Sequence, residues 1–419
     1  MTTAASDPDA PVRSVLMLSP EPPYPMHGGG AYRIASLAHY FARFAHVDLV
    51  LFSDSGMPAV LPAGLVRSQT VIRLPIHKRG IFARYFRNAG RAFRGVPPLI
   101  DRLSGHAGEL AQALSGRHYD LGIVEHFWCA PYLEQIAAVC DRTALDLHNI
   151  ESVLHERCAL TSSGLVALGQ RRFFRCSRRL EAALFPGYSL CLAASAEDAA
   201  AARRLAPAGR VEVYPNSLPE VPVPNVREEP VVVFSGNFEY HPNIDAVEFL
   251  ANSIWPGVRS RCPELRLRLV GRGDRFVRHL LPSGLNIEVT GPIEDARAEI
   301  AAARIVIAPL RAGSGTRIKI LEAWAAARPV VATSIAAEGL EYRQDCDLLI
   351  ANEGPSIVGA IAGLNAEPAR RARIAASGRR LFEERYTWNA SWRALSTALS
   401  PGRTGTAPLY TEDSNANRR

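Results

Sequence analysis

The sequence predicts an α/β protein in which two doubly wound parallel-sheet domains follow one another along the chain. Short apolar runs alternate with longer helical patterns, which is typical of parallel α/β units. This alternation stops at a Pro-rich stretch, 216–224, and then starts again. The chain has 419 residues, which exceeds what one hydrophobic core usually supports.

The first domain is predicted over residues 14–217, after a flexible N-terminus at 1–13. A helix is expected at 32–44, because Ile34, Leu37, Ala38 and Phe41 recur at helical spacing. A Pro- and Gly-rich loop with Gly28, Gly29 and Gly30 precedes it. Compact apolar runs predict the strands of one sheet at 14–20, 46–52, 70–75, 120–126, 143–148 and 189–195.

The second domain is predicted over residues 230–385, after a stiff linker at about 217–229. Its strands are expected at 230–236, 265–271, 286–291, 304–310, 329–334 and 347–351. Helical patterns lie between them at 243–260, 294–303, 316–328 and 355–385. A helix at about 386–400 is a candidate to pack back on the first domain. The tail at 401–419 is polar and contains Gly and Pro, so we expect it to be disordered.

Composition restricts the class of protein. No apolar run approaches the roughly 18 residues of a membrane span, and the N-terminus has no apolar signal region. The seven cysteines are dispersed without CxxC spacing, which argues against a disulfide framework or a structural zinc site and favours the cytoplasm. The net charge of +7 is compatible with a solvated arginine-rich surface or with attraction to anions. No recognition motif accompanies the charge, so nucleic acid is not an expected partner.

The loop and helix start after the strand at 304–310 form the most informative motif. Its glycines, Gly313 and Gly315, allow close approach to a ligand. Thr316 can cap the following helix, whose free N–H groups attract anions. Two cations and a carboxylate follow on that helix, at Arg317, Lys319 and Glu322. The motif predicts a diphosphate site, with Glu322 placed to accept hydrogen bonds from ribose hydroxyls. Ser314 completes the loop.

Other strand ends in the second domain carry weaker signals. The first strand ends at Gly236 and Asn237, the second at Gly271, and the third at Thr290 and Gly291. Ligands bind at the carboxyl ends of strands in open parallel sheets, so these residues are candidate parts of the same site. A glycine at a strand end is as often only a tight turn.

In their order along the chain, these segments resemble glycosyltransferase family four. The resemblance rests on SGNFEYHPNIDAVEFL, LRLRLVGRGD and the stretch from VTGPIED to AAEGLE, together with PYPMHGGG, ALDLHNIES and VYPNSLP in the first domain. It covers about 14–385. It implies the GT-B fold, in which two Rossmann-like domains face each other across an interdomain cleft that holds the active site. It also implies transfer of a sugar from a UDP-, GDP- or dTDP-sugar to a glycan, lipid-linked or small-molecule acceptor, with retention and without a bound metal.

The resemblance further implies roles for particular residues. Arg317 and Lys319 would neutralise the departing diphosphate, and the backbone at Thr290 and Gly291 would meet the base. Gly28 to Gly30 would face the donor phosphates or the acceptor. Glu322 matches the second Glu of the family's two-Glu signature. The first Glu is replaced by Ser314, in a GSGTRxK form that some branches of the family have.

The first domain offers further candidates. His148 ends an apolar strand and is a candidate partner of the transferred sugar, although a lone histidine is more often structural. Glu125 and His126 end the neighbouring strand, where such a pair could orient an acceptor hydroxyl or simply be a surface pair. Arginines and aromatic residues interleave at 78–95, a candidate for peripheral contact with the inner face of a membrane or an ordinary domain helix. The arginines at 171–179 read as a solvated face.

Two other functions stay open at this point. One is a non-catalytic relative that binds nucleotide sugars, which the serine at position 314 keeps open. The other is a sugar-nucleotide epimerase of the same architecture. An epimerase would need acid and base carboxylates in the cleft, for which the sequence shows no convincing pair.

Overall fold

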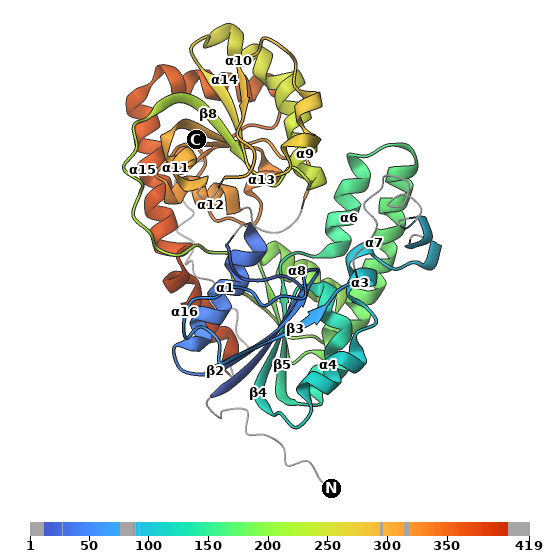
Figure 1. The fold of residues 1–419 in the computed structure, drawn as a ribbon. Coiled ribbons are helices and arrows are strands. Elements are labelled where there is room, and N and C mark those ends of the chain that lie inside the picture. Colours follow the sequence, from blue (N-terminus) through green and yellow to red (C-terminus); the bar gives the residue numbers. More distant parts are fainter. Residues whose placement is uncertain are drawn as a thin grey trace, which may run out of the picture.

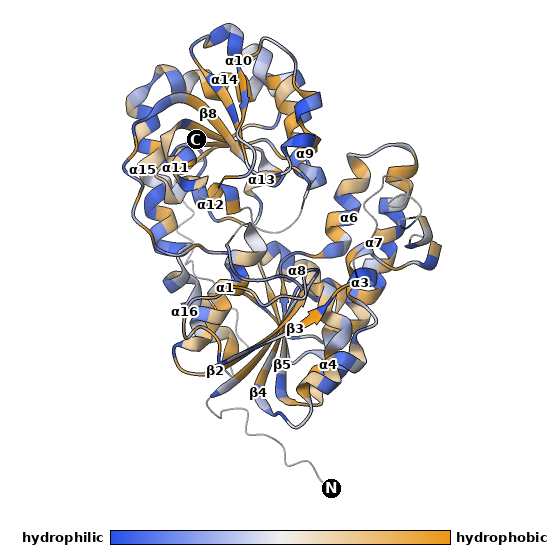
Figure 2. Cartoon of the chain, in the orientation of Figure 1, coloured by the Kyte–Doolittle hydropathy of each residue, from blue (hydrophilic) through white to orange (hydrophobic). Residues whose placement is uncertain are grey.

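The computed structural model describes residues 12–26, 28–75, 87, 89–91, 93–293, 296–313 and 318–400. The described residues form two α/β domains, drawn one above the other in Figure 1. Each domain contains one parallel sheet with helices on both faces, which confirms the predicted fold class. Figure 2 shows apolar residues concentrated on the strands and polar residues on the outer faces of the helices.

The sheet of the first domain has seven parallel strands in the order β3-β2-β1-β4-β5-β6-β7. The strands are β1 (Ser14–Ser19), β2 (His46–Ser53), β3 (Ser68–Arg73), β4 (Tyr119–Glu125), β5 (Cys140–Leu147), β6 (Leu190–Ala193) and β7 (Val211–Val213). Leu16 and Leu18 pack in a core on one face, and Val15 and Met17 pack in a second core on the other. Because both faces are covered, the strand reads as a continuous apolar run.

Helices cover both faces of this sheet. They are α1 (Gly29–Ala42), α3 (Pro98–Leu103), α4 (Ala107–Leu114), α5 (Leu133–Ala137), α6 (Glu151–Leu160), α7 (Gly164–Leu184) and α8 (Ala196–Leu205), with 3-10 turns η1 (Phe127–Tyr132) and η2 (Phe185–Gly187). α6 and α7 form an antiparallel hairpin that projects beside the second domain (Figure 1).

The sheet of the second domain has six parallel strands in the order β10-β9-β8-β11-β12-β13. The strands are β8 (Glu229–Ser235), β9 (Arg266–Val270), β10 (Ile287–Val289), β11 (Ala303–Ala308), β12 (Val330–Ala332) and β13 (Leu349–Ile350). The helices are α9 (His241–Phe249), η3 (Leu250–Ile254), α10 (Trp255–Arg261), η4 (Asp274–Phe276), η5 (Arg278–Leu280), α11 (Ala296–Ala302), α12 (Ile318–Ala325), α13 (Ser334–Ala337), α14 (Gly354–Ala366) and α15 (Pro368–Arg385).

The chain passes between the domains twice. On the first passage, the Leu218 N–H donates to the carbonyl of Tyr386 at 3.0 Å, and the Trp388 N–H returns a bond to Leu218 at 2.9 Å. On the second passage, α16 (Trp388–Leu399) packs against the first domain. There the Trp392 indole donates to Ser36 Oγ at 3.0 Å. The two crossings therefore lie side by side.

Two helical patterns divide differently from the prediction. The pattern at 355–385 forms two helices, because Pro368 cannot continue a helix from the residues before it and instead begins α15. The pattern at 243–260 is interrupted by the π turn η3, after which Pro256 lies in the first turn of α10. The segments 1–11, 76–86 and 401–419 lie outside the described residues. Among the described helices, none combines the length and apolarity needed to cross a membrane.

Candidate functional site

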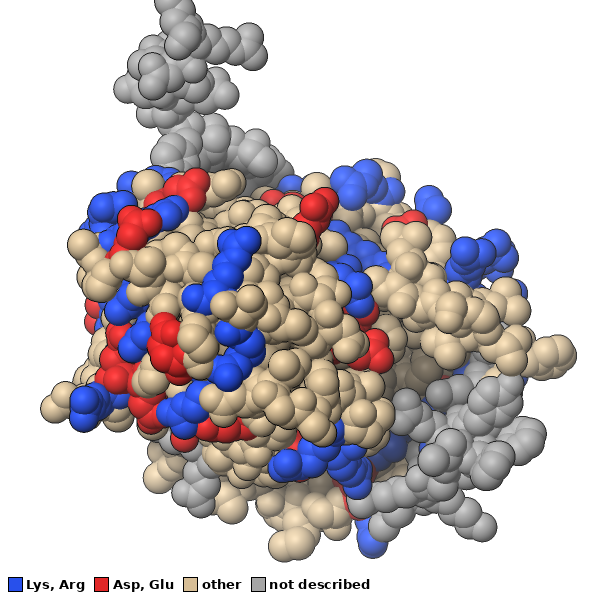
Figure 3. All heavy atoms as spheres, turned by 90° about the horizontal axis from the view of Figure 1, so that it is seen from above, with Lys and Arg blue, Asp and Glu red and all other residues tan. Residues whose placement is uncertain are grey.

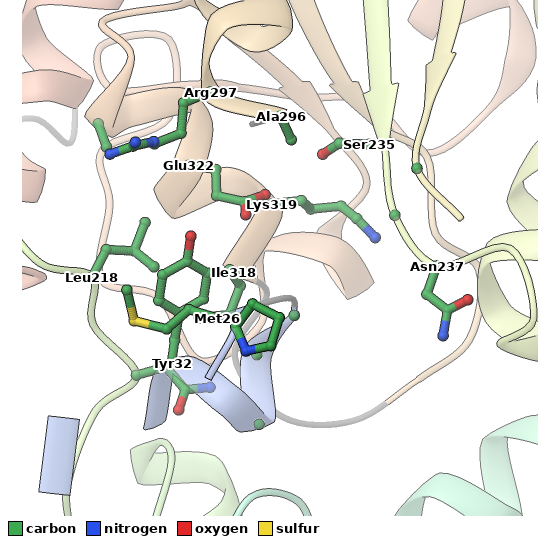
Figure 4. A pocket seen from close by; sticks show the side chains of 18 of the residues that line it. Met26, Tyr32, Leu218, Ser235, Asn237, Ala296, Arg297, Ile318, Lys319 and Glu322 are labelled. Atoms are coloured by element: carbon green, nitrogen blue, oxygen red, sulfur yellow. The ribbon is translucent and has the colours of Figure 1, made fainter. Parts of the chain in front are cut away.

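A cavity of about 1080 Å³ lies between the two domains (Figure 4). Strand ends of both sheets, the linker after Asn216 and the start of α12 contribute to its wall. The residues that the sequence singled out and that line it are Gly28, Gly29, Gly30, His126, His148, Gly236, Asn237, Gly271, Lys319 and Glu322. The structure therefore brings together candidates that lie almost 300 residues apart in the chain.

Lys319 reaches from α12 to the end of β8. Its Nζ donates to Asn243 Oδ1 at 2.9 Å, and Asn243 Nδ2 donates to the carbonyl of Asn237 at 2.8 Å. The amine also lies 5.0 Å from the centroid of the Phe234 ring, within range of a cation–π contact. The ammonium group is thus held at the carboxyl edge of the second sheet, where parallel sheets bind phosphates.

Two glycines allow β8 and β9 to end close together at the same wall. Gly271 has φ of 139°, and a Cβ there would lie 2.0 Å from the carbonyl oxygen of Gly236. No side chain fits in that space. The tight turn is therefore enough to explain why position 271 is a glycine, without any contact to a ligand. Arg272 follows it and lines the cavity, which adds a second cation to the donor side.

Glu322 lies one turn after Lys319 on α12 and also lines the cavity (Figure 4). Burial raises the pKa of its carboxyl group to about 7, and the nearby charge of Lys319 partly opposes that rise. The group therefore changes charge near neutral pH. An uncharged carboxyl can donate one hydrogen bond, and the carboxylate only accepts.

On the first-domain side, the start of α1 lies against Glu21 and His126. A Cβ on Gly30 would lie 2.0 Å from Glu21 Oε1 and 3.2 Å from His126 Nε2. The Glu21 carboxylate and the His126 ring are 3.4 Å apart. Burial alone would raise the pKa of Glu21, but the hydrogen bond and charge of His126, with His148 and Arg272, lower it overall. Glu21 is thus an anion at the cavity wall.

His126 belongs to a stack of three rings. It lies 4.2 Å from the Trp128 ring at an interplanar angle of 7° and 3.4 Å from the His148 ring at 25°. Its φ of 62° is unusual for a residue other than glycine. The N–H bond to the carbonyl of Asp146 at 3.1 Å helps to hold this conformation. Backbone strain of this kind concentrates at functional sites.

A buried ion pair between Arg33 and Asp146 contacts the stack at His148. The Arg33 guanidinium binds both oxygens of Asp146, at 2.7 Å and 2.6 Å, and both side chains are almost completely buried. Arg33 also donates to the carbonyl of Tyr214 and to Asn216 Oδ1, at 2.6 Å and 2.9 Å. Burial opposes the charge of Asp146, but Arg33 holds its pKa well below the usual range. The pair joins α1, β5 and the beginning of the linker.

His148 and Glu125 complete this buried group. His148 Nε2 lies 3.0 Å from Glu125 Oε2 and 3.3 Å from Asp146 Oδ2. Burial, with the charge of His126, lowers the pKa of His148 to about 4, so the ring is neutral at pH 7. Burial and the charge of Asp146 raise the pKa of Glu125 well above its usual value. A neutral histidine whose Nε2 faces the ionised carboxylate of Asp146 donates from that nitrogen and leaves Nδ1 as an acceptor.

Glu125, Asp146 and His148 also form the grouping best suited to hold a metal ion among the described residues. One ligand atom from each lies within 4.8 Å of the others. However, Arg33 already binds both carboxylate oxygens of Asp146. A metal ion there would have to share the carboxylate with a buried guanidinium, so the donor set fits a metal poorly.

α6 forms a bridge from the first domain to the donor side. Arg157 Nη1 donates to the carbonyl of Gly313 at 2.8 Å, and Nη2 donates to Glu338 Oε1 at 2.7 Å. Gly313 has φ of 126° and is the last described residue before the loop at 314–317. Arg157 thus connects α6 to the base of the predicted donor loop.

The remaining predicted residues do not line the cavity or lie outside the residues that the structure describes. Glu125 is fully buried behind His148 and does not line the cavity, so it is placed to act through His148 and not on an acceptor directly. Thr290, Gly291 and Gly313 do not line the cavity. Pro292 and Ile293, which follow Gly291 in the chain, do line it. Ser314, Gly315, Thr316 and Arg317 lie outside the described residues.

Sequence reasoning missed several residues of the wall. Glu21 follows the first strand, and Arg272 lies in the Gly-Arg-Gly turn after the strand at 265–271. A charged residue at the end of a strand was therefore the feature of the sequence that could have identified both as site residues. Asn243, Arg297 and Trp128 carried no such signal, because their place depends on how helices and turns fold back toward the cavity. The ion pair of Arg33 and Asp146 joins residues 113 positions apart.

Comparison with known proteins gives a family match for the second domain. Residues 229–365 match the family model described as Glycosyl transferases group 1. None of the curated proteins matches the chain by sequence.

Solved structures resemble the whole chain. Sucrose-phosphate synthase from Thermosynechococcus elongatus is 17% identical, covers 92% of this chain and 97% of its own, and has a TM-score of 0.70. HepE from Anabaena in complex with UDP-glucose is 17% identical, with coverage of 92% and 98% and a TM-score of 0.61. A mutant of TarM from S. aureus in complex with UDP and sugar ligands is 10% identical, with coverage of 92% and 99% and a TM-score of 0.65. These likenesses show the fold, and with the family match they support a glycosyltransferase of the GT-B fold.

Proposed function

We propose that the protein transfers a sugar from a nucleotide-sugar donor to a hydroxyl acceptor in the cavity between its domains. The main support for this proposal is that one cavity is lined by Lys319 of the second domain and by His148 and Glu21 of the first domain. The Lys319 ammonium group lies there near the end of β8. A donor diphosphate would meet the cation on one side, and the sugar would meet the first domain on the other.

The cations on the second-domain side of the cavity would weaken the bond between the sugar and the diphosphate leaving group. Negative charge develops on the diphosphate as the sugar departs, and a fixed cation stabilises that charge. Lys319 is held by Asn243, and Arg272 lies at the same wall. That Arg317 also stabilises the charge on the diphosphate stays a prediction. A UDP-sugar is the donor to test first, because structures of the same fold contain UDP-glucose or UDP.

The acceptor half lies at Glu21 and His126. The anionic carboxylate can accept a hydrogen bond from an acceptor hydroxyl, while the Nδ1 of the neutral His148 ring can accept one from a sugar hydroxyl. The acceptor itself is proposed as a glycan, a lipid-linked sugar or a small hydroxyl compound. We further propose retention at the anomeric carbon, as in the family that the sequence resembles.

No metal is proposed for this reaction. Protein cations can supply the charge stabilisation that a divalent ion supplies in other sugar transferases. Turnover should therefore be the same after treatment with EDTA and after addition of Mg²⁺ or Mn²⁺. A loss of activity on chelation that either ion restores would contradict this part of the proposal.

The proposal is tested by nucleotide release from a panel of UDP-, GDP-, ADP- and dTDP-sugars. One donor should be hydrolysed slowly alone and faster with a hydroxyl acceptor, and the product's anomeric configuration is read by NMR. A donor that raises the melting temperature without any release of nucleotide would identify a non-catalytic relative. Conversion of a donor to an epimer would identify an epimerase.

A further inference from the structure

The end of the α6–α7 hairpin exposes four large apolar side chains. Leu160 is 80% exposed, Leu165 70%, Val166 58% and Leu168 64%, and we call these four residues the hairpin tip. They lie at the last residue of α6 and in the first turns of α7, so they are close together in space. Isolated exposed apolar residues are common, but a contiguous group marks an interaction surface.

The outward face of α7 continues the tip with basic side chains. Leu165, Leu168, Arg172, Arg175 and Arg179 follow at intervals of three and four residues, and so lie along one stripe of the helix. The opposite stripe, with Phe173, Ser177 and Glu181, is buried in the domain.

The exposed charges of α7 all have the same sign. The helix contains five arginines, at 171, 172, 175, 178 and 179, and each is exposed. Its one acidic residue, Glu181, is fully buried. Helical rise places Arg172 about 10 Å from Leu165 along the axis. Figure 3 shows the hairpin side of the molecule, at the right, with basic and uncharged side chains at its rim.

The chain at Gly95 borders this surface. A Cβ on Gly95 would lie 3.1 Å from Cys176 Sγ and 3.6 Å from Arg172 Nη2, and the nearby Phe93 is 87% exposed. An exposed aromatic ring thus lies two residues before Gly95, which is beside the arginine stripe of α7.

We infer that the hairpin tip and the arginine stripe of α7 dock on an anionic lipid bilayer. An apolar tip gains free energy by entering the acyl boundary, and arginines one to three turns away then lie at the depth of the phosphate groups. A protein partner would have to supply several acidic groups around an apolar recess, whereas an anionic bilayer offers both features everywhere. The charge pattern therefore favours lipid.

Docking at this place would set the cavity beside the membrane. Leu160 lies three residues after Arg157, whose side chain contacts the second domain at the edge of the donor site. A bilayer that receives the tip would therefore lie near the contact of Arg157 with Gly313, on the donor side. The inference stands on the hairpin alone and does not depend on the proposed transfer reaction.

The test is binding to vesicles followed by sedimentation of the full chain. Phosphatidylcholine vesicles are compared with vesicles that also contain phosphatidylglycerol, at low and high salt. We expect binding only to the anionic vesicles and weaker binding at high salt. The double variant Leu165→Ser/Leu168→Ser should bind at least about tenfold less. Arg175→Gln and Arg179→Gln should each lower binding about fivefold.

The matched control is Met57→Ser/Val60→Ser, which alters two exposed apolar residues in the loop between β2 and β3. It should bind vesicles like the unchanged protein. Equal loss in this control, equal binding to both vesicle types, or no binding at all would overturn the inference. So would a dimer in light scattering that the tip variant converts to a monomer, because the tip would then be an interface between copies. Nucleotide release by the tip variant, measured without vesicles, reports separately on the proposed transfer.

Discussion

Gly30 shows how a single residue shapes the acceptor side of the cavity. The space for its missing side chain is occupied by the Glu21 carboxylate, 2.0 Å from where a Cβ would be. Gly30 lies in α1, where alanine would otherwise be preferred over glycine by roughly 0.5–1 kcal/mol. The glycine therefore makes sense as the residue that lets Glu21 and His126 approach the helix.

The substitution Gly30→Ala should consequently impair acceptor use. Displacement of Glu21 from His126 should raise the KM for the acceptor about tenfold, with little change in donor affinity, because one hydrogen bond to a charged group is worth about 1.5–3 kcal/mol. Steady-state kinetics would measure both constants. Gly359→Ala is the control, since its Cβ would meet nothing within 4 Å in α14. An unchanged acceptor KM in Gly30→Ala would contradict the role of Glu21.

Glu322 makes donor binding sensitive to pH. Burial raises the pKa of this carboxyl group to about 7, so the group ionises as the pH rises through neutrality. Ribose hydroxyls donate more strongly to a carboxylate than to a neutral carboxyl group. Donor affinity should therefore increase about fivefold from below to above pH 7, which corresponds to about 1 kcal/mol.

Calorimetric titration with an intact nucleotide sugar measures this dependence, because its diphosphate does not titrate in the range. Glu322→Gln should bind with an affinity that is flat over the same range. A flat profile for the unchanged protein, or a rise that persists in Glu322→Gln, would show that the ribose does not meet this carboxylate.

At the scale of elements, α6 joins the two halves of the site. Arg157 binds the carbonyl before the donor loop and forms a two-point ion pair with Glu338, after α13. Exposed ion pairs contribute little, but this pair is partly shielded and spans two domains. It therefore favours the arrangement in which Gly313, the last described residue before the donor loop, faces α6 of the first domain.

Reversal of the pair tests this bridge. Arg157→Glu should raise the donor KM about tenfold, because two carboxylates would then face each other. Combining it with Glu338→Arg should recover part of the loss, with a coupling energy of about 1 kcal/mol in a double-mutant cycle. Recovery should be incomplete, since the bond to the carbonyl of Gly313 is not rebuilt. Strictly additive effects would contradict a direct contact.

The elements themselves were largely predictable from local patterns. The apolar run at 14–20 became β1, and the helical spacing at 32–44 became most of α1. Such runs identify strands and helices because both faces of a parallel sheet are buried. The break at Pro368 was also visible in principle, since proline begins helices more readily than it continues them.

At the scale of the whole molecule, the contacts that define the site could not be read from the sequence. Arg157 and Glu338 are 181 residues apart, and Arg33 and Asp146 are 113 apart. Each pair depends on which strands are neighbours and on how the two domains face each other. Glu125 illustrates the consequence: its place at a strand end was predictable, but its burial behind His148 was not.

The central claim is that the donor diphosphate binds in the interdomain cavity against Lys319. Its most direct test is calorimetric titration of the accepted nucleotide sugar into the unchanged protein, Lys319→Ala and Arg373→Ala, whose substituted arginine is exposed on α15 away from the cavity. Loss of a charge-assisted contact of about 1.5–3 kcal/mol should weaken binding by about 10–100-fold in Lys319→Ala. Arg373→Ala should bind normally. Equal affinity of all three proteins would contradict the claim.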